Sequence, residues 1–224
     1  MKKVILTGSS GMIGKGVLLE CLDNNQIEEV LVINRQPTTI NHPKLKEVIH
    51  QDFLEFESIK GALHGFDACI HCMGVSAMGM NESDYFKLTF SVTESLAKTL
   101  YQLNENITFI YVTGSGTDSS EKGPMMWARI KGKTENMLFN MGFNDVYAFR
   151  PGGIIPEKGT KPKVVYIQLI LSIFRPLFPI LKLFPAITTT SRIGQAMINV
   201  LLTPINKKVL MGSDINQICK RHTG

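Results

Sequence analysis

The chain is poor in cysteine and lacks the marks of secretion. Only four cysteines occur among 224 residues, too few for the disulfide framework of a small secreted protein. Lys2 and Lys3 lead into an apolar run that ends at Thr7, much shorter than the apolar region of a signal peptide. From these two absences we expect a protein without a signal peptide in the reducing cytoplasm.

Metal ligands at a useful spacing are also absent. Cys69 and Cys72 form a Cys-x-x-Cys pair, but on the strand that we expect there their side chains would point to opposite faces. We interpret both as small buried apolar residues. His71 lies between them without a second ligand at a suitable spacing, so no metal site is predicted.

Acidic residues are scarce in one part of the chain, and that part carries the whole net charge of +5. Between Pro156 and Arg192 the only acidic residue is Glu157, against six basic residues. Nucleic-acid binding would require a basic stripe with aromatic residues or a helix-turn-helix context. Nothing else in the sequence supplies either, and we predict no nucleic-acid partner.

Internal repeats and low-complexity linkers are missing as well, so nothing marks a domain boundary. With 44% hydrophobic residues, a chain of this length can bury a sizeable core as one unit. We therefore predict a single domain over residues 1–224 and expect either a monomer or a homodimer.

The most informative stretch that is present is Lys2–Gly16, which reads KKVILTGSSGMIGKG. A short apolar run precedes three glycines spaced G-x-x-G-x-x-G, and a helix-compatible segment follows, a context typical of dinucleotide binding. Gly8 would permit the tight turn, Gly11 would let the backbone approach a pyrophosphate, and Gly14 would let the helix pack closely on the sheet. The N-terminus of that helix would face the phosphates. The cofactor contacts predicted here are Thr7, Gly8, Ser10, Gly11, Met12, Ile13 and Gly14.

The end of the second expected strand, Glu29–Asn34, indicates which dinucleotide is preferred. NAD-binding domains usually carry an Asp or Glu at this point to hold the ribose 2′-hydroxyl. Asn34 and Arg35 stand here instead, and a guanidinium can pair with a 2′-phosphate. We predict NADP(H) as the preferred cofactor and NAD(H) as the alternative. A solvated Arg35 in a loop is the competing interpretation.

Two further strand ends would border the same cofactor. Asp52 and Phe53 follow the third expected strand, Leu45–His50. Asp52 could accept from the adenine amino group or cap the helix that comes next. Gly74 follows the fourth strand, Phe66–Met73, at a point where the backbone would pass close to the nicotinamide.

The rest of the chain alternates helices with short apolar strands. This alternation predicts an α/β fold, a Rossmann-type doubly wound parallel sheet. The helix expected after Gly74 would carry Tyr85, Leu88, Val92, Leu96 and Leu100 along one face. The elements expected are helices at Glu82–Leu103, Met125–Met141, Ser191–Leu202 and Asp214–His222, and strands at Ile107–Val112, Asn144–Arg150 and Lys207–Met211.

Residues 164–184 are mostly apolar and long enough to raise the question of a membrane span. Arg175, Lys182 and two prolines argue against a span, because prolines break a helix in its middle. We favour two short helices in a mostly helical insertion, residues 152–192, that forms a lid or covers the substrate side of the sheet. Contact with a membrane surface is the alternative, because basic residues flank the apolar runs.

The glycine motif, Asp52, the helix that carries Lys131 and the F-R-P-G sequence at Phe149–Gly152 together resemble a short-chain dehydrogenase/reductase. More narrowly, they are similar to the atypical or extended branch described as NAD-dependent epimerase/dehydratase-like, NmrA-like or Tat-interacting oxidoreductase-like. The resemblance covers most of the chain and implies further cofactor contacts from Lys131, Pro151 and Gly152. It also implies a small-molecule substrate, which the sequence does not identify.

The resemblance implies catalytic residues too: a Ser or Thr after the fifth strand, and a Tyr-x-x-x-Lys motif on the next helix whose Tyr shuttles a proton. Thr113 and Ser115 occupy the loop. Lys131 keeps the Lys position, where it would donate a hydrogen bond to the nicotinamide ribose. Trp127 replaces the Tyr, and an indole N–H does not ionise in the usable range. The catalytic candidates are therefore Thr113, Ser115 and Lys131.

Two hypotheses of function follow. The first is an NADP(H)-dependent oxidoreductase or epimerase whose proton comes from Ser115, Thr113, a water or the substrate. The second is a non-catalytic dinucleotide-binding module whose occupancy regulates association with a partner or a membrane. Lys131 and the loop hydroxyls favour the enzyme, whereas Trp127 favours the module. We rank the enzyme slightly ahead.

Overall fold

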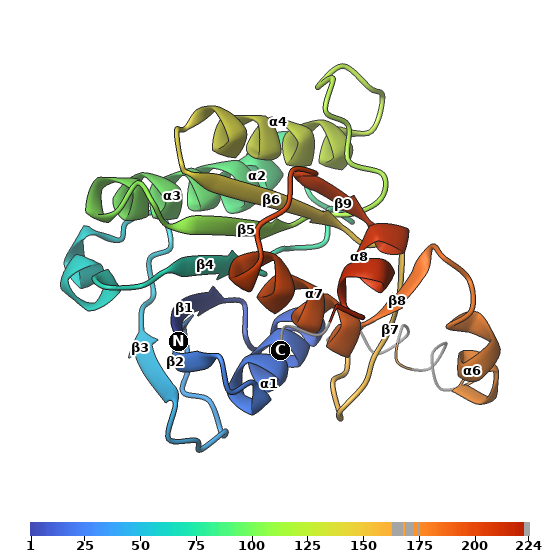
Figure 1. The fold of residues 1–224 in the computed structure, drawn as a ribbon. Coiled ribbons are helices and arrows are strands. Elements are labelled where there is room, and N and C mark those ends of the chain that lie inside the picture. The colour runs from blue at the N-terminus through green and yellow to red at the C-terminus, as the bar shows by residue number, and fades with distance from the viewer. Residues whose placement is uncertain (163–167, 169–172, 174, 222–224) are drawn as a thin grey trace.

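The computed structural model describes residues 1–162, 168, 173 and 175–221. Its centre is a seven-stranded sheet in the order β3-β2-β1-β4-β5-β6-β9, and every pair of neighbours is parallel (Figure 1). The order reverses between β1 and β4, which makes this point the topological switch of a doubly wound sheet. The predicted fold class is confirmed. The strands are β1 (Lys2–Thr7), β2 (Ile27–Asn34), β3 (Leu45–Ile49), β4 (Ala68–His71), β5 (Thr108–Val112), β6 (Asp145–Arg150) and β9 (Val209–Met211).

Helices cover both faces of the sheet (Figure 1). Consecutive residues of β1 serve opposite faces: Val4 and Leu6 pack with one set of helices, and Ile5 packs with the other. Both faces are therefore buried, which explains why the strands read as continuous apolar runs. The first set is α1 (Met12–Asp23), α7 (Thr190–Leu202) and α8 (Gly212–Ile218), and the second is α2 (Glu82–Phe86), α3 (Val92–Leu103) and α4 (Met126–Asn140).

Helices α1 and α7 pack at close range because each presents a glycine to the other. A Cβ atom on Gly16 would lie 2.6 Å from Cβ of Thr190, and one on Gly194 would lie 2.8 Å from Cγ of Glu20. The close packing buries the first face of the sheet under two helices that are far apart in sequence. It also fixes α1, whose first turn borders the glycine motif.

The helix expected over Glu82–Leu103 contains a π-helical turn at Lys87–Ser91 between α2 and α3. Tyr85, Val92, Leu96 and Leu100 are buried, whereas Leu88 is 41% exposed, so the five residues predicted to share one face do not all pack in the core. A π turn adds a residue and rotates the following positions, and such turns often occur at functional sites. The helix predicted to follow Asp52 and Phe53 is a 3-10 helix, Glu57–Leu63.

The segment after β6 begins and ends in strands that the sequence did not predict. Strands β7 (Gly153–Ile155) and β8 (Ile187–Thr189) pair in parallel as a separate two-stranded sheet. Between them the structure describes a 3-10 turn at Arg175–Leu177 and helix α6 (Phe178–Leu181), which projects from the body of the molecule (Figure 1). Of the two helices predicted over 164–184, residues 164–167, 169–172 and 174 lie outside the described residues. No helix in the described part is long and apolar enough to cross a bilayer.

Candidate dinucleotide site

A cleft of about 420 Å³ opens at the carboxyl ends of β1, β2 and β4. This is the place where open α/β sheets bind their ligands. The cleft brings together eight of the residues predicted from sequence: Gly8, Ser10, Gly11, Asn34, Arg35, Asp52, Phe53 and Gly74. Other residues that line it were missed: Ile33, Gln51, Leu54, Cys72, Met73, Val75, Lys87, Leu88 and Val92.

The three glycines have different reasons to be glycine. Gly8 has φ +76°, and a Cβ there would lie 2.7 Å from the Cys72 carbonyl, so both conformation and space require glycine. A Cβ on Gly14 would lie 2.1 Å from the carbonyl oxygen of Gly8, which shows that the first turn of α1 packs directly on the preceding loop. Gly11 faces the cleft, where the nearest protein atom to an added Cβ is 3.3 Å away.

The N-terminus of α1 begins beside the cleft at Gly11. No side chain of the described residues caps it, so the first N–H groups of the helix are available to an anion. Together with the glycine turn, this forms the cradle that a pyrophosphate requires. The residues present therefore fit a dinucleotide.

Asn34 is held by its own neighbours. Its Oδ1 accepts from Ser9 Oγ at 2.8 Å, and its Nδ2 donates to Glu47 Oε1 at 2.8 Å. Glu47 also accepts from the backbone N–H of Thr38 at 2.9 Å. Asn34 thus ties the glycine turn to the end of β2 and to β3, and its amide is already engaged. Ser9 and Glu47 were not predicted.

A second hollow of about 570 Å³ adjoins the cleft around Arg35. Ser9, Ser10, Thr38 and Gln51 are among the residues that line it. Arg35 is exposed and makes no ion pair among the described residues, while its carbonyl oxygen accepts from Gln51 Nε2 at 2.7 Å. A cation beside two serines and a threonine is suited to an anion.

Asp52 lies at the cleft and is exposed. Its Oδ1 accepts from the backbone N–H of Leu54 at 2.9 Å, which stabilises the turn before the 3-10 helix. Its Oδ2 accepts no hydrogen bond from a described residue, so Asp52 could contact adenine and stabilise the local turn at the same time. The capping interpretation is wrong, because the 3-10 helix Glu57–Leu63 begins after Phe56 and no side chain of the described residues caps it. The contact of Asp52 with adenine stays a prediction.

Behind the cleft, a buried histidine connects the glycine loop to α3. His71 Nδ1 lies 2.8 Å from Thr7 Oγ1, and its Nε2 lies 3.1 Å from Thr93 Oγ1. Thr93 donates to the Thr89 carbonyl at 2.6 Å, so the neutral ring donates from Nε2 and accepts at Nδ1. Burial lowers the pKa of His71 to about 3. Thr7 is thus a buried support, and with Met12, Ile13 and Gly14 it does not line the cleft.

The catalytic candidates lie on the loop after β5 and on α4. The Thr113 hydroxyl donates to Glu135 Oε1 at 2.6 Å, and Glu135 forms a buried ion pair with Arg150. Lys131 Nζ donates to the Thr113 carbonyl oxygen at 3.1 Å, and burial lowers its pKa while Glu135 raises it. Glu135 and Arg150 were missed, although Glu135 follows Lys131 at a helical i+4 spacing.

Trp127 and Ser115 complete this region. Lys131 Nζ lies 6.0 Å from the centre of the Trp127 ring, whose outer edge packs on Gly116. Ser115 is exposed, and its backbone N–H donates to the Pro151 carbonyl at 3.0 Å. Gly152 adjoins this loop and β8, because a Cβ there would lie 2.7 Å from the Ala186 carbonyl oxygen. None of these residues lines the dinucleotide cleft itself.

Comparison with known proteins agrees with this geometry. Residues 4–123 match the sequence profile described as the NAD dependent epimerase/dehydratase family. Over 229 residues, 98% of this chain and 96% of the relative, the chain is 22% identical to "Protein FMP52, mitochondrial" of Meyerozyma guilliermondii. It is 24% identical over 160 residues to "Protein HTATIP2" of Rattus norvegicus, which covers 70% of this chain and 64% of that protein.

Solved structures share the fold. UDP-glucuronic acid 4-epimerase from Bacillus cereus, in complex with NAD, superposes with a TM-score of 0.66 at 16% identity. The match covers 93% of this chain and 77% of that one. At this identity the likeness concerns the fold alone.

The cytoplasmic location predicted from composition is wrong by the same comparison. The relative from Meyerozyma guilliermondii is named as mitochondrial, and so are those from Aspergillus niger and Candida albicans. The physical reason is that a low cysteine count separates oxidising from reducing compartments and does not separate one reducing compartment from another.

Proposed function

Since the chain belongs to the NAD-dependent epimerase/dehydratase family, we propose that it is an NADP(H)-dependent oxidoreductase or epimerase acting on a small molecule. The observation that supports this best is the cleft at the switch point, where the Gly8–Gly14 turn, the uncapped start of α1 and Arg35 converge. The pyrophosphate would lie against Gly11 and the first turn of α1, and the nicotinamide end would pass Gly74.

The hollow around Arg35 supports the preference for NADP(H). Asn34 stands where the carboxylate of an NAD-binding domain would accept a hydrogen bond from the ribose 2′-hydroxyl. Its own amide is already hydrogen-bonded to Ser9 and Glu47. Arg35 beside Ser10 and Thr38 would instead pair with a 2′-phosphate.

Arg35→Ala tests this assignment. We expect the variant to lose about 1.5–3 kcal/mol of NADPH binding, the range for hydrogen bonds to charged groups, and to bind NADH almost unchanged. Binding is measured by titration calorimetry for both cofactors. Lys98→Ala, which removes a positive charge from α3 outside the cleft, should leave both affinities unchanged. Equal losses for the two cofactors in Arg35→Ala would contradict the assignment.

The region around Lys131 supports the oxidoreductase part of the proposal. A bound nicotinamide would supply the hydride chemistry. Lys131 is anchored to Thr113 through one N–H, which leaves its other donors for a ribose hydroxyl. Thr113 is held by Glu135, so Ser115 is the hydroxyl of this loop that is exposed and able to exchange a proton with substrate.

Trp127 favours a second candidate function, a non-catalytic NADP(H)-binding module. Its indole cannot act as the proton shuttle, and the edge of its ring lies against Gly116. The two candidates differ in whether any carbonyl substrate is reduced at all, and substitutions at positions 115 and 127 distinguish them.

A further inference from the structure

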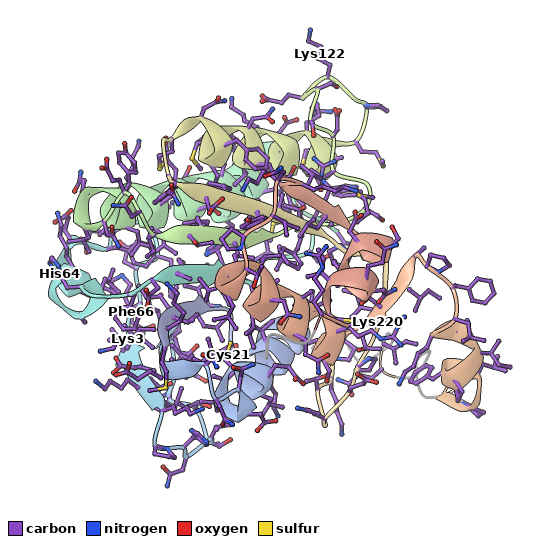
Figure 2. The ribbon with its side chains drawn as sticks, viewed as in Figure 1. Lys3, Cys21, His64, Phe66, Lys122 and Lys220 are labelled. Carbon is purple, nitrogen blue, oxygen red and sulfur yellow. The ribbon has the colours of Figure 1, made fainter. Side chains whose placement is uncertain are left out.

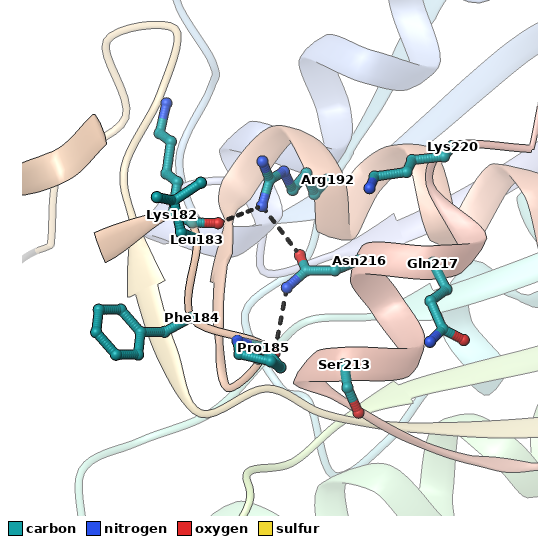
Figure 3. A pocket seen from close by; sticks show the side chains of 9 residues that line it. All are labelled: Lys182, Leu183, Phe184, Pro185, Arg192, Ser213, Asn216, Gln217 and Lys220. Atoms are coloured by element: carbon teal, nitrogen blue, oxygen red, sulfur yellow. Dashed lines mark hydrogen bonds between the residues drawn. The ribbon is translucent and has the colours of Figure 1, made fainter. Parts of the chain in front are cut away.

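A second cleft, of about 340 Å³, lies beside α7 and α8 (Figure 3). It shares no lining residue with the dinucleotide cleft or with the hollow around Arg35. Its walls come from residues 182–185, from Arg192 on α7 and from one side of α8.

The cleft is basic. Lys182, Arg192 and Lys220 line it, and no carboxylate does so in the described part of the chain. Lys182 is neutralised by Glu157, but Arg192 and Lys220 make no ion pair with any described residue. Among the residues that the structure describes, Arg192 Nη1 donates only to the Lys182 carbonyl oxygen and to Asn216 Oδ1, both at a weak 3.4 Å. Within the described part of the chain, two positive charges therefore lack an acidic partner and are suited to an external anion (Figure 3).

Nearby acidic groups do not compensate these charges. Glu157 is engaged by Lys182, and Asp214 at the start of α8 pairs with Lys207 at 2.7 Å and accepts from the backbone of Met211.

The rim of the cleft is apolar and exposed. Leu183 is 80% exposed, Ile180 58% and Phe184 54%. Single exposed apolar residues are ordinary on a protein surface, but a group of them beside a basic cleft marks an interaction site. All three belong to α6 or to the turn after it, the part of the chain that projects from the body (Figure 1). The sequence predicted that the apolar residues 164–184 cover their own domain. The described side chains of Ile180, Leu183 and Phe184 are instead exposed.

We propose that this cleft and its apolar rim dock on the surface of an anionic phospholipid bilayer. Arg192 and Lys220 would bind headgroup phosphates, while Ile180, Leu183 and Phe184 enter the boundary of the acyl chains. Charge complementarity decides the occupant. A second copy of this chain would bring like charges together, and a soluble anion would leave the apolar rim in water.

Vesicle flotation tests the proposal. The full chain should float with vesicles of phosphatidylcholine mixed with phosphatidylglycerol and should stay behind with phosphatidylcholine alone. Lys220→Gln should weaken partitioning about fivefold, because each basic residue near such a surface contributes about 1 kcal/mol. Leu183→Ser should weaken it by at least about tenfold through lost apolar burial.

Lys122→Gln is the matched control for charge, because Lys122 is exposed and lies far from Lys220 (Figure 2). It should float like the wild type, and thermal unfolding should show that every variant is folded. Flotation that is equal for both vesicle types, absent from both, or unchanged in Leu183→Ser would overturn the proposal.

Two other results would also overturn it. Binding of inorganic phosphate that Lys220→Gln weakens, without flotation of the wild type, would make the cleft a site for a soluble anion. A dimer in sedimentation that Leu183→Ser dissociates, again without flotation, would make the rim an interface between copies of this chain.

Discussion

The Thr113 hydroxyl donates to Oε1 of Glu135 at 2.6 Å, so the loop after β5 is fastened to a buried carboxylate on α4. That carboxylate is 1% exposed and is paired with Arg150 at the end of β6. Lys131, one helical turn before Glu135, holds the Thr113 carbonyl oxygen from the same helix. One threonine thus links two strand ends to the helix that carries the Lys and Trp of the expected catalytic motif.

We predict that Thr113 and Ser115 have separable roles. Thr113→Val should lower the free energy of unfolding by about 1.5–3 kcal/mol, because it removes a hydrogen bond to a charged group. Ser115→Ala should change that free energy by less than about 0.5 kcal/mol, as for an ordinary surface substitution, but should reduce kcat if Ser115 supplies the proton. Urea unfolding and steady-state kinetics measure the two effects. A Ser115→Ala enzyme with full kcat would remove Ser115 as the proton donor.

Trp127→Tyr should increase the NADPH-dependent reduction of aldehydes and ketones. General acid catalysis typically contributes about a hundred- to ten-thousand-fold, and a phenol beside Lys131 could supply it. Burial lowers the pKa of Lys131, so the charge beside the new phenol should be lost at a lower pH than for an exposed lysine. Trp127→Phe is the control, because it changes the size of the side chain without adding a proton. Equal rates for the Tyr and Phe variants would show that position 127 does not limit proton transfer.

The buried His71 should make the fold sensitive to mild acid. Its pKa is lowered from 6.5 to about 3 by burial, so the native protein binds this proton less readily than the unfolded chain. The contribution of the neutral His71 to the free energy of unfolding is then complete above pH 6.5 and decreases as the pH falls toward 3. By pH 5 the loss should reach about 2 kcal/mol, which urea unfolding across this range would detect.

His71→Gln is the control for this effect. A glutamine can accept from Thr7 and donate to Thr93 without titrating. The free energy of unfolding of this variant should therefore change less between pH 6.5 and pH 5 than that of the wild type. Glu157, whose pKa is lowered by Lys182 against the opposing effect of burial, loses stabilisation only below the ordinary value of 4.5. A wild type and variant with the same slope in this window would exclude His71 as the cause.

Substitutions in the glycine motif should separate binding from folding. Gly11→Val should lower the melting temperature less than Gly14→Ala does, because its Cβ would lie 3.3 Å from the nearest protein atom. It should weaken both dinucleotides at least about tenfold, because its side chain would enter the space for pyrophosphate. Gly14→Ala should instead destabilise the protein, since its Cβ would lie 2.1 Å from the Gly8 carbonyl oxygen. Thermal unfolding and cofactor titration are measured on both. A Gly11→Val variant that binds NADPH normally would place the pyrophosphate elsewhere.

Much of the sheet could be predicted because its signals are local. The apolar run of β1, the glycine spacing after it and the alternation of helices and strands depend on residues adjacent in sequence. The three-residue strands β7 and β8 were missed, because elements so short show no periodicity and form only by pairing across 33 residues of sequence, as between Ile154 and Thr188. The π turn at Lys87–Ser91 was missed for a related reason, since an added residue inside a helix leaves no compositional trace.

The sequence by itself determined the class of fold, the position of the phosphate-binding turn and the replacement of the expected catalytic Tyr by Trp127. Each of these depends on the identity and spacing of a few neighbouring residues. Only the tertiary structure decided which polar groups are engaged and which are available. Asn34 and Thr113 are held by Glu47 and Glu135, whereas Arg35 and Arg192 face open hollows without an ion pair in the described part of the chain. Hydrogen-bond partners come from distant strands and helices, so the free or engaged state of a side chain follows from packing and cannot be read from spacing.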